Sequence, residues 1–150
     1  MVTLRSAPNL NNWRPADLVE TAIAWKNAVD SKTTPTCLIF SRQETSAIQR
    51  TQEHISSIQF GGYLLEENDD YKITIVASGS EVQLALDAAE ELNNSSISTN
   101  VVSMPSLDIF LEQSEEYKNK IIDPNKPVLV VECGHPNSWF RILNLSLIHI

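Results

Sequence analysis

The order of apolar and polar residues along the chain predicts strands that alternate with helices. Short apolar runs typical of strands lie at 37–40, 72–78, 98–104 and 126–132. Helical patterns lie between them at 16–30, 79–94 and 106–122. Residues 1–5 alternate and indicate one more strand, residues 6–13 are loop-like, and the last helix is expected to be broken. This alternation predicts an α/β fold with a parallel sheet and helices packed on its faces.

The helix at 16–30 has the signals of a helix start and one apolar face. Pro15 suits the first turn, and Asp17 and Glu20 place negative charge at the positive end of the helix dipole. Four apolar residues repeat at helical spacing, namely Leu18, Ala22, Trp25 and Val29. The pattern predicts that this face packs in the core; contact with another subunit is the alternative.

The two later helices also carry start signals. Ser80 is predicted to cap the helix at 79–94, with Glu81 in its first turn. Its apolar face consists of Val82, Ala85, Leu86 and Ala89. Ser106 is the predicted cap of the helix at 106–122, and Asp108 lies in its first turn.

A polar region separates two units of this kind. Residues 41–59 lack a clean period, and the glycines of FGGY at 60–63 interrupt the chain directly after them. We expect this region to cross between two domains. The run Cys37-Leu38-Ile39-Phe40 just before it is apolar throughout, which predicts a strand buried on both faces.

Composition and charge exclude several classes of protein. The 150 residues carry a net charge of −8, which argues against a nucleic-acid partner because phosphate binding needs a basic surface. No apolar run approaches the roughly 18–20 residues of a membrane span, and the first residues lack the apolar core of a secretory signal. Cys37 and Cys133 show no zinc-ligand spacing and read as small buried side chains, so a reduced, cytoplasmic setting is expected.

Arg42 is the one residue placed to carry chemistry. It follows the apolar run 37–40, and ligands of parallel sheets bind beyond the carboxyl ends of the strands. A guanidinium group at this edge can hold a phosphate or carboxylate through two parallel hydrogen bonds. On the residues alone, an ordinary surface arginine remains the favoured alternative.

Three other patterns are better explained by structure than by chemistry. The turn at Ser78–Glu81 could hold an anion at a helix start, but it lacks the glycine-rich phosphate motifs. Cys133 and His135 stand two residues apart on a predicted turn, where side chains seldom face each other. The acidic runs at 66–70 and 115–116 lack the spacing of a calcium loop and read as solvated surface.

The order of several short strings carries more information than any one of them. These are PNLNNWRPAD, ETAIAWKNAV, PTCLIFSRQ, GGYLL, VASGSEVQLALDAAEEL, VVSMPSLDIFLEQ and VLVVECG. Together, from about Leu4 to about Gly134, they resemble transketolase. WRPAD and SRQ favour this family over two other thiamine enzymes with the same domain pair, deoxyxylulose-phosphate synthase and the pyruvate dehydrogenase beta subunit. A non-catalytic assembly module, such as half of a split enzyme, is a further alternative.

The resemblance implies a division of the chain. Residues 1–52 look like the tail of the pyrimidine-binding domain of transketolase, a remnant of its parallel sheet, and residues 53–62 like a linker. Residues 63–144 look like a truncated C-terminal domain with βαβαβ order and a mostly parallel sheet. Residues 145–150, LSLIHI, resemble a translated sequencing adapter, so the chain reads as a gene fragment. The sheet edge beside residues 37–40 would lie open, and we expect the isolated chain to be unstable or oligomeric.

The resemblance also implies a function. Transketolases are homodimers of the pentose phosphate pathway that need thiamine diphosphate and Mg²⁺ to move a two-carbon ketol unit between phosphorylated sugars. The arginine of the family's SRQ motif grips the sugar phosphate, and here the motif is Ser41-Arg42-Gln43, so this role falls on Arg42. The family's catalytic, cofactor and metal residues lie upstream of Met1, so none is expected in this chain, and the chain alone is expected to be inactive.

Overall fold

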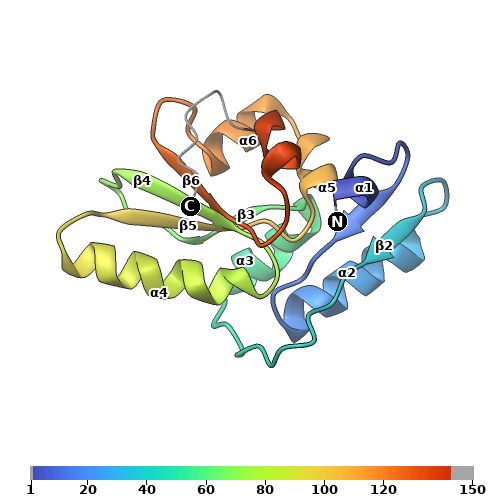
Figure 1. Cartoon of the computed structure of the whole chain (residues 1–150), viewed down its shortest axis with the longest axis horizontal. Helices are drawn as coiled ribbons and strands as arrows, with labels where there is room; N and C mark the ends of the chain where they lie inside the picture. The colour runs from blue at the N-terminus through green and yellow to red at the C-terminus, as the bar shows by residue number, and fades with distance from the viewer. Residues whose placement is uncertain (1, 143–150) are drawn as a thin grey trace.

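The computed structural model describes residues 2–142, which contain two separate β-sheets (Figure 1). The smaller sheet pairs β1 (Asn11–Trp13) with β2 (Thr36–Leu38) in parallel. The larger sheet has the order β3-β5-β4-β6, with bounds Tyr63–Glu66, Thr99–Ser103, Ile73–Ala77 and Val128–Val131. β5, β4 and β6 are parallel and β3 is antiparallel, so the predicted α/β fold with a mostly parallel sheet is confirmed.

Helices cover both faces of the larger sheet. The helices of the chain are α1 (Val2–Arg5), α2 (Leu18–Asp30), α3 (Gln52–Ser57), η1 (Ile58–Phe60), α4 (Glu81–Asn94), α5 (Leu107–Leu111), α6 (Glu115–Ile121) and η2 (Pro136–Arg141). In Figure 1, α4 runs below the sheet, whereas α5, α6 and η2 lie above it. None of the helices within residues 2–142 is long and apolar enough to cross a membrane.

The alternation of side chains along the strands creates two separate cores. Successive residues of a strand point to opposite faces, so Ile75 of β4 packs in one core with Val82 and Ala85 of α4. Val76, the next residue, packs in the other core with Phe110 of α5. The predicted apolar face of the helix at 79–94 is thereby confirmed.

The predicted helix starts are confirmed in position, with one difference in how they are capped. The Ser106 hydroxyl accepts from the Ile109 N–H at 3.4 Å, as predicted, and the helical region 106–122 is broken into α5 and α6. Ser80 precedes α4 as predicted, but its hydroxyl donates to the Glu81 carboxylate at 3.1 Å instead of capping the helix. The serine hydroxyl thus pairs with the neighbouring carboxylate, and no side-chain cap forms at the start of α4.

The N-terminal prediction is wrong. Residues 1–5 were expected to form a strand, but α1 is helical, and β1 lies inside the expected loop at 6–13. The reason is a set of tertiary hydrogen bonds: the backbone N–H and the side-chain amide of Asn12 both donate to Asp108 of α5, at 3.0 and 2.9 Å. The same amide donates to the Leu4 carbonyl oxygen at 3.2 Å, which joins α1 to β1.

The predicted core face of α2 is also wrong, because it points to solvent. Leu18 is 85% exposed, Trp25 53% and Val29 75%, and Ala22 is exposed as well. The inner face of the helix instead carries a carboxylate, Glu20, which is fully buried. Apolar periodicity misses a buried face when one of its key residues is charged.

The strand predicted at 37–40 is shorter and less buried than expected. β2 ends at Leu38, its residues are half-buried, and Phe40 is 47% exposed and stacks on Trp25 with ring centroids 6.4 Å apart. Residues 39–51 contain no helix or strand, and α3 and η1 occupy most of the predicted linker 53–62. The domain boundaries remain predictions, and residues 145–150 lie outside the described residues.

A buried polar network joins the start of α2 to the larger sheet. Its five members are Asp17 and Glu20 at the start of α2, Arg50 before α3, Tyr63 of β3 and Ser103 of β5. Oε1 of Glu20 accepts from the Tyr63 hydroxyl at 2.8 Å, from Ser103 Oγ at 2.6 Å and from Arg50 Nη2 at 3.2 Å. Burial, and then the Glu20 charge, raise the pKa of Tyr63, so its hydroxyl stays protonated and donates. We call these residues the Glu20 network.

Replacing Glu20 by alanine is expected to destabilise the chain by about 3–5 kcal/mol, because the buried donors of Arg50, Tyr63 and Ser103 lose their common acceptor. Asp30→Ala is the matched control, since Asp30 lies on the same helix but pairs with Lys26 at the surface; it should change stability by less than about 0.5 kcal/mol. Urea unfolding followed by circular dichroism measures both. Equal effects of the two variants would contradict a role for the Glu20 network in stability.

Candidate functional site

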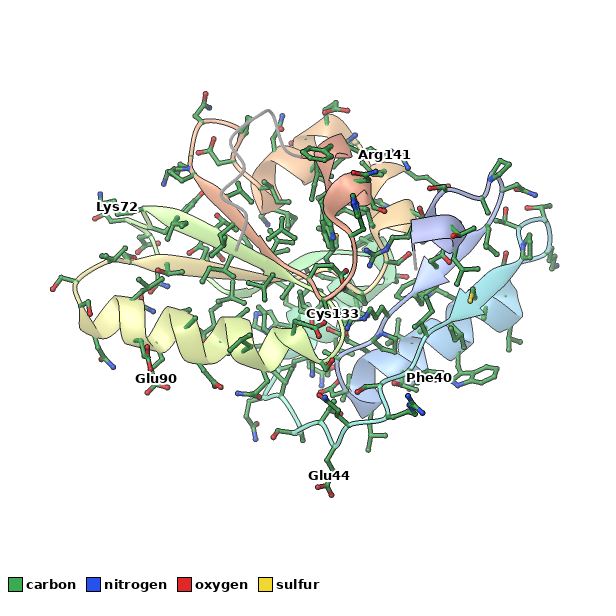
Figure 2. All side chains as sticks on the ribbon, viewed as in Figure 1. Phe40, Glu44, Lys72, Glu90, Cys133 and Arg141 are labelled. Carbon is green, nitrogen blue, oxygen red and sulfur yellow. The ribbon has the colours of Figure 1, made fainter. Side chains whose placement is uncertain are left out.

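Arg42 lies beyond the carboxyl end of β2 on the exposed segment 40–47. The Ile39 N–H donates to the Trp13 carbonyl oxygen at 2.8 Å and continues the β1–β2 pairing by one bond. After this bond, the segment makes a local contact in which the Gln43 N–H donates to Ser41 Oγ at 2.9 Å. Figure 2 shows Glu44 pointing outward from the same segment. Arg42 therefore stands at the sheet edge where the sequence predicts a ligand contact.

Arg42 differs from most arginines of the chain in having no partner. Of the five arginines, Arg5, Arg14 and Arg50 form ion pairs with buried carboxylates. Within the described residues, Arg42 has neither a hydrogen bond nor an ion pair to another side chain. Its charge is thus available to a ligand, whereas those three charges are already neutralised.

Arg14 forms the centre of a second charged site, where the carboxyl ends of several strands meet. It directly follows β1, and its N–H donates to the Pro105 carbonyl oxygen, just after β5, at 2.7 Å. Its guanidinium group donates to the Ser78 carbonyl oxygen, after β4, at 2.6 Å and to Glu132, after β6, at 3.2 Å. Arg14 also pairs with Glu81 at the start of α4. A cation thus fills the point at which the strands converge.

The turn at Ser78–Glu81 is occupied by this cation. Gly79 has φ +61°, and a Cβ there would lie 2.8 Å from Cγ of Arg14, so the turn closes directly over the arginine. The turn presents the Ser78 carbonyl oxygen and hydroxyl to the guanidinium group. Its chemistry is the reverse of the anion site that the strand-to-helix turn suggests.

Glu132 is the main counter-charge and was not singled out from the sequence. Its side chain is 3% exposed and accepts from Arg5 at 2.9 Å and from Arg14 at 3.2 Å. Burial raises the pKa of Glu132, but Arg5 and Arg14 outweigh burial and lower the pKa below its ordinary value. The signal available in the sequence was an acidic residue at the carboxyl end of a predicted strand.

Cys133 and His135 do not form a nucleophile and base. Burial, followed by Glu81 and Glu132, raises the pKa of the Cys133 thiol despite the opposing effect of Arg14, so the thiol is not activated. His135 instead accepts from the Asn137 N–H at 3.4 Å and precedes η2. Cys133 is exposed and Cys37 is half-buried, so the prediction that both are small buried side chains is wrong for Cys133.

A search of known proteins gives the family. A family model described as the transketolase-like TK C-terminal domain matches residues 61–150, more than half of the chain. The chain belongs to the transketolase family. The predicted resemblance is thereby confirmed, and with it the preference for transketolase over the two other thiamine enzymes.

Individual transketolases extend the likeness to the N-terminal residues. Over 148 residues, the chain is 41% identical to transketolase 1 of Vibrio parahaemolyticus and 40% identical to transketolase 2 of Escherichia coli. Each match covers 97% of this chain and 22% of the relative. A crystal structure of Pichia stipitis transketolase with sedoheptulose-7-phosphate superposes with a TM-score of 0.87 at 40% identity, covering 92% of this chain and 20% of that one. The chain thus spans about a fifth of the length of its transketolase relatives.

The acidic group around Arg14 does not fit the Mg²⁺ that the transketolase family implies. Ligand atoms of Glu81, Glu132 and Cys133 lie within 4.8 Å of one another. Arg14 pairs with both carboxylates and therefore takes the place of a cation. One of the three ligands is also a thiol, whereas Mg²⁺ takes oxygen ligands.

Glu132→Gln is expected to destabilise this transketolase chain by about 3 kcal/mol at pH 7, because two arginines lose a buried counter-charge. The pKa of Glu132 is lowered on folding, so its contribution is present above its ordinary value of 4.5 and is lost as the pH falls below it. The difference in the free energy of unfolding between the variant and the wild type should therefore become smaller below pH 4.5. Urea unfolding at several pH values measures this difference. Glu91→Gln, at an exposed position on α4, is the control, and a gap independent of pH would refute the assignment.

Proposed function

We propose that this chain is part of a thiamine-diphosphate-dependent transketolase and that Arg42 contacts the phosphate of its sugar substrate. The complete enzyme would transfer a two-carbon ketol unit between phosphorylated sugars as a cytoplasmic homodimer. The proposal is supported by the family membership and by a structural neighbour that was crystallised with sedoheptulose-7-phosphate.

The observation that carries the Arg42 assignment is its unpaired charge at the carboxyl end of β2. Phosphate recognition favours a planar guanidinium group that can donate two parallel hydrogen bonds. Arg42 is exposed and has no partner within residues 2–142, so no existing ion pair has to be broken before it binds an anion. In a chain with a net charge of −8, such a group also provides one of few sites for a phosphorylated ligand.

The cofactor and metal of the proposed enzyme are assigned to the part of transketolase that this chain does not span. The chain covers 22% of its relatives, and its clustered acidic residues are paired with Arg14. What the described residues supply is substrate binding, which is also why the isolated chain is proposed to be inactive.

A hybrid enzyme tests the proposed function. In this hybrid, the present chain replaces the matching 148 residues of Vibrio parahaemolyticus transketolase 1. Ketol transfer between phosphorylated sugars is expected from the hybrid with thiamine diphosphate and Mg²⁺, and none is expected from the isolated chain. A folded but inactive hybrid would favour the assembly-module alternative. Activity of the chain alone would refute the proposal that the cofactor and metal residues lie in the part of transketolase that this chain does not span.

Within the hybrid, Arg42→Ala is expected to raise the KM for phosphorylated sugars about 30- to 900-fold, because a charge-assisted contact to phosphate is lost. Arg42→Lys keeps the charge but loses the bidentate geometry, so its KM for phosphorylated sugars should lie between that of the wild-type hybrid and that of Arg42→Ala. The KM for an unphosphorylated ketol donor should stay the same in both variants.

Arg141→Ala is the matched control for this measurement. Arg141 is also an exposed arginine without an ion pair in the described part of the chain, but it belongs to η2, and Figure 2 shows it far from Phe40 and Glu44. Its removal should leave the KM unchanged. Equal effects of the two alanine variants would indicate non-specific attraction of phosphate and would overturn the Arg42 assignment.

A further inference from the structure

The segment that carries Arg42 is fixed at its two ends and free between them. Residues 40–47 are all exposed, and no helix or strand forms between residues 39 and 51. At the first end, Ile39 pairs with Trp13 of β1 and Phe40 stacks on Trp25 of α2. At the second end, Ile48 and Arg50 bind the start of α2. In Figure 1, this segment runs along the lower edge of the molecule from β2 to α3. We call residues 39–50 the Arg42 loop.

A single carboxylate closes the second end of the Arg42 loop. Asp17 is 6% exposed, and its Oδ1 caps α2 by accepting from the Glu20 N–H at 3.1 Å. Its Oδ2 accepts from the Ile48 N–H at 3.2 Å and from Arg50 Nη1 at 2.5 Å. One side chain thus holds the beginning of the helix and the end of the loop in a fixed relation.

Arg50 is held in turn by the rest of the Glu20 network. Its side chain is 1% exposed, and it donates to Glu20 at 3.2 Å and to the Tyr63 hydroxyl at 2.7 Å. Burial lowers the pKa of Arg50, but Tyr63, Asp17 and Glu20 outweigh burial and raise it, so the guanidinium group remains charged. The loop end is therefore bound by a permanent ion pair that solvent barely reaches.

We propose that Asp17 and Arg50 are positioning residues for Arg42. Their ion pair fixes the end of the Arg42 loop against the start of α2 and so sets where the Arg42 guanidinium group meets the sugar phosphate. This inference rests on the proposed phosphate contact of Arg42. It adds that the contact depends on a buried pair formed by Arg50, eight residues further along the chain, and Asp17 at the start of the neighbouring helix.

The effect of the pair on substrate binding is separable from its effect on stability. A residue that acts only on stability changes the fraction of folded enzyme, and with it the measured kcat, equally for all substrates. A residue that positions Arg42 changes the KM for phosphorylated substrates selectively. Asp17→Asn suits this test because it keeps the size of the side chain and an oxygen for the cap, while it removes the charge that Arg50 and Ile48 share.

In the hybrid enzyme, Asp17→Asn is expected to raise the KM for phosphorylated sugars about tenfold, a change of roughly 1.4 kcal/mol. The KM for an unphosphorylated ketol donor and the kcat should change by less than about twofold. In a hybrid that already carries Arg42→Ala, Asp17→Asn should cause no further rise, because the two residues act on one contact. Asp30→Asn, at the other end of α2, is the control and should have no effect.

Tryptic cleavage after Arg42 gives an independent readout of the loop in both the hybrid and the isolated chain. Proteolysis follows the population of open conformers, so cleavage at Arg42 should be about tenfold faster in Asp17→Asn than in Asp30→Asn. Cleavage after Lys72, which follows a different loop, should be equal in the two variants.

Each outcome decides between the two proposals. If Arg42→Ala has no selective effect on phosphorylated sugars, the proposed phosphate contact is wrong. If Arg42→Ala has that effect but Asp17→Asn has none, the phosphate contact stands and the positioning role is overturned. Equal cleavage after Arg42 in Asp17→Asn and Asp30→Asn overturns the positioning role even when the hybrid is inactive.

Discussion

The buried carboxylate of Glu20 is the interaction on which the arrangement of the molecule depends. A carboxylate without contact to water is costly unless its oxygens accept hydrogen bonds and a cation stands nearby. Glu20 meets this requirement with donors from three places in the chain, namely Arg50 before α3, Tyr63 in β3 and Ser103 in β5. α2 cannot shift relative to the larger sheet without breaking several of these bonds together. The network thus gives a small two-sheet structure a defined geometry that apolar contact alone would specify less sharply.

The arginines of the chain fall into two kinds, those that pair with buried carboxylates and those that are exposed. Arg14 and Arg50 lie inside the structure, where each pairs with two carboxylates and connects elements far apart in the sequence. Arg42 lies outside and connects nothing. The guanidinium group therefore stabilises the fold at Arg14 and Arg50 and is available to bind a ligand at Arg42. What separates these roles is the supply of carboxylates within reach, which is a property of the tertiary fold.

The sequence predicted the larger sheet well because its strands and helices follow local rules. Val76 and Val102 lie in apolar runs, and Val82, Ala85 and Ala89 repeat at helical spacing, so pattern and packing agree. The structure of the N-terminal part depends instead on long-range hydrogen bonds and a buried charge. The strand around Asn12 depends on Asp108, almost a hundred residues away, and the inner face of α2 is marked by a charge where the pattern predicts an apolar residue. Likewise, the position of Arg42 could be predicted from the strand before it, but the role of Asp17 could not, since only the fold brings it to Ile48 and Arg50.

The close approach of Gly79 to Arg14 has a consequence for how such a chain can change. Any side chain at position 79 would collide with the arginine, and the left-handed backbone there also disfavours other residues. A smaller residue in place of Arg14 would relieve the crowding but would leave Glu132 with Arg5 alone and would take from Glu81 its ion pair. The two positions are therefore constrained to be inherited together, although one lies in the N-terminal part and the other in the C-terminal part. Recombination between related genes at a point between them would place a larger residue against Arg14 wherever the second parent lacks the glycine.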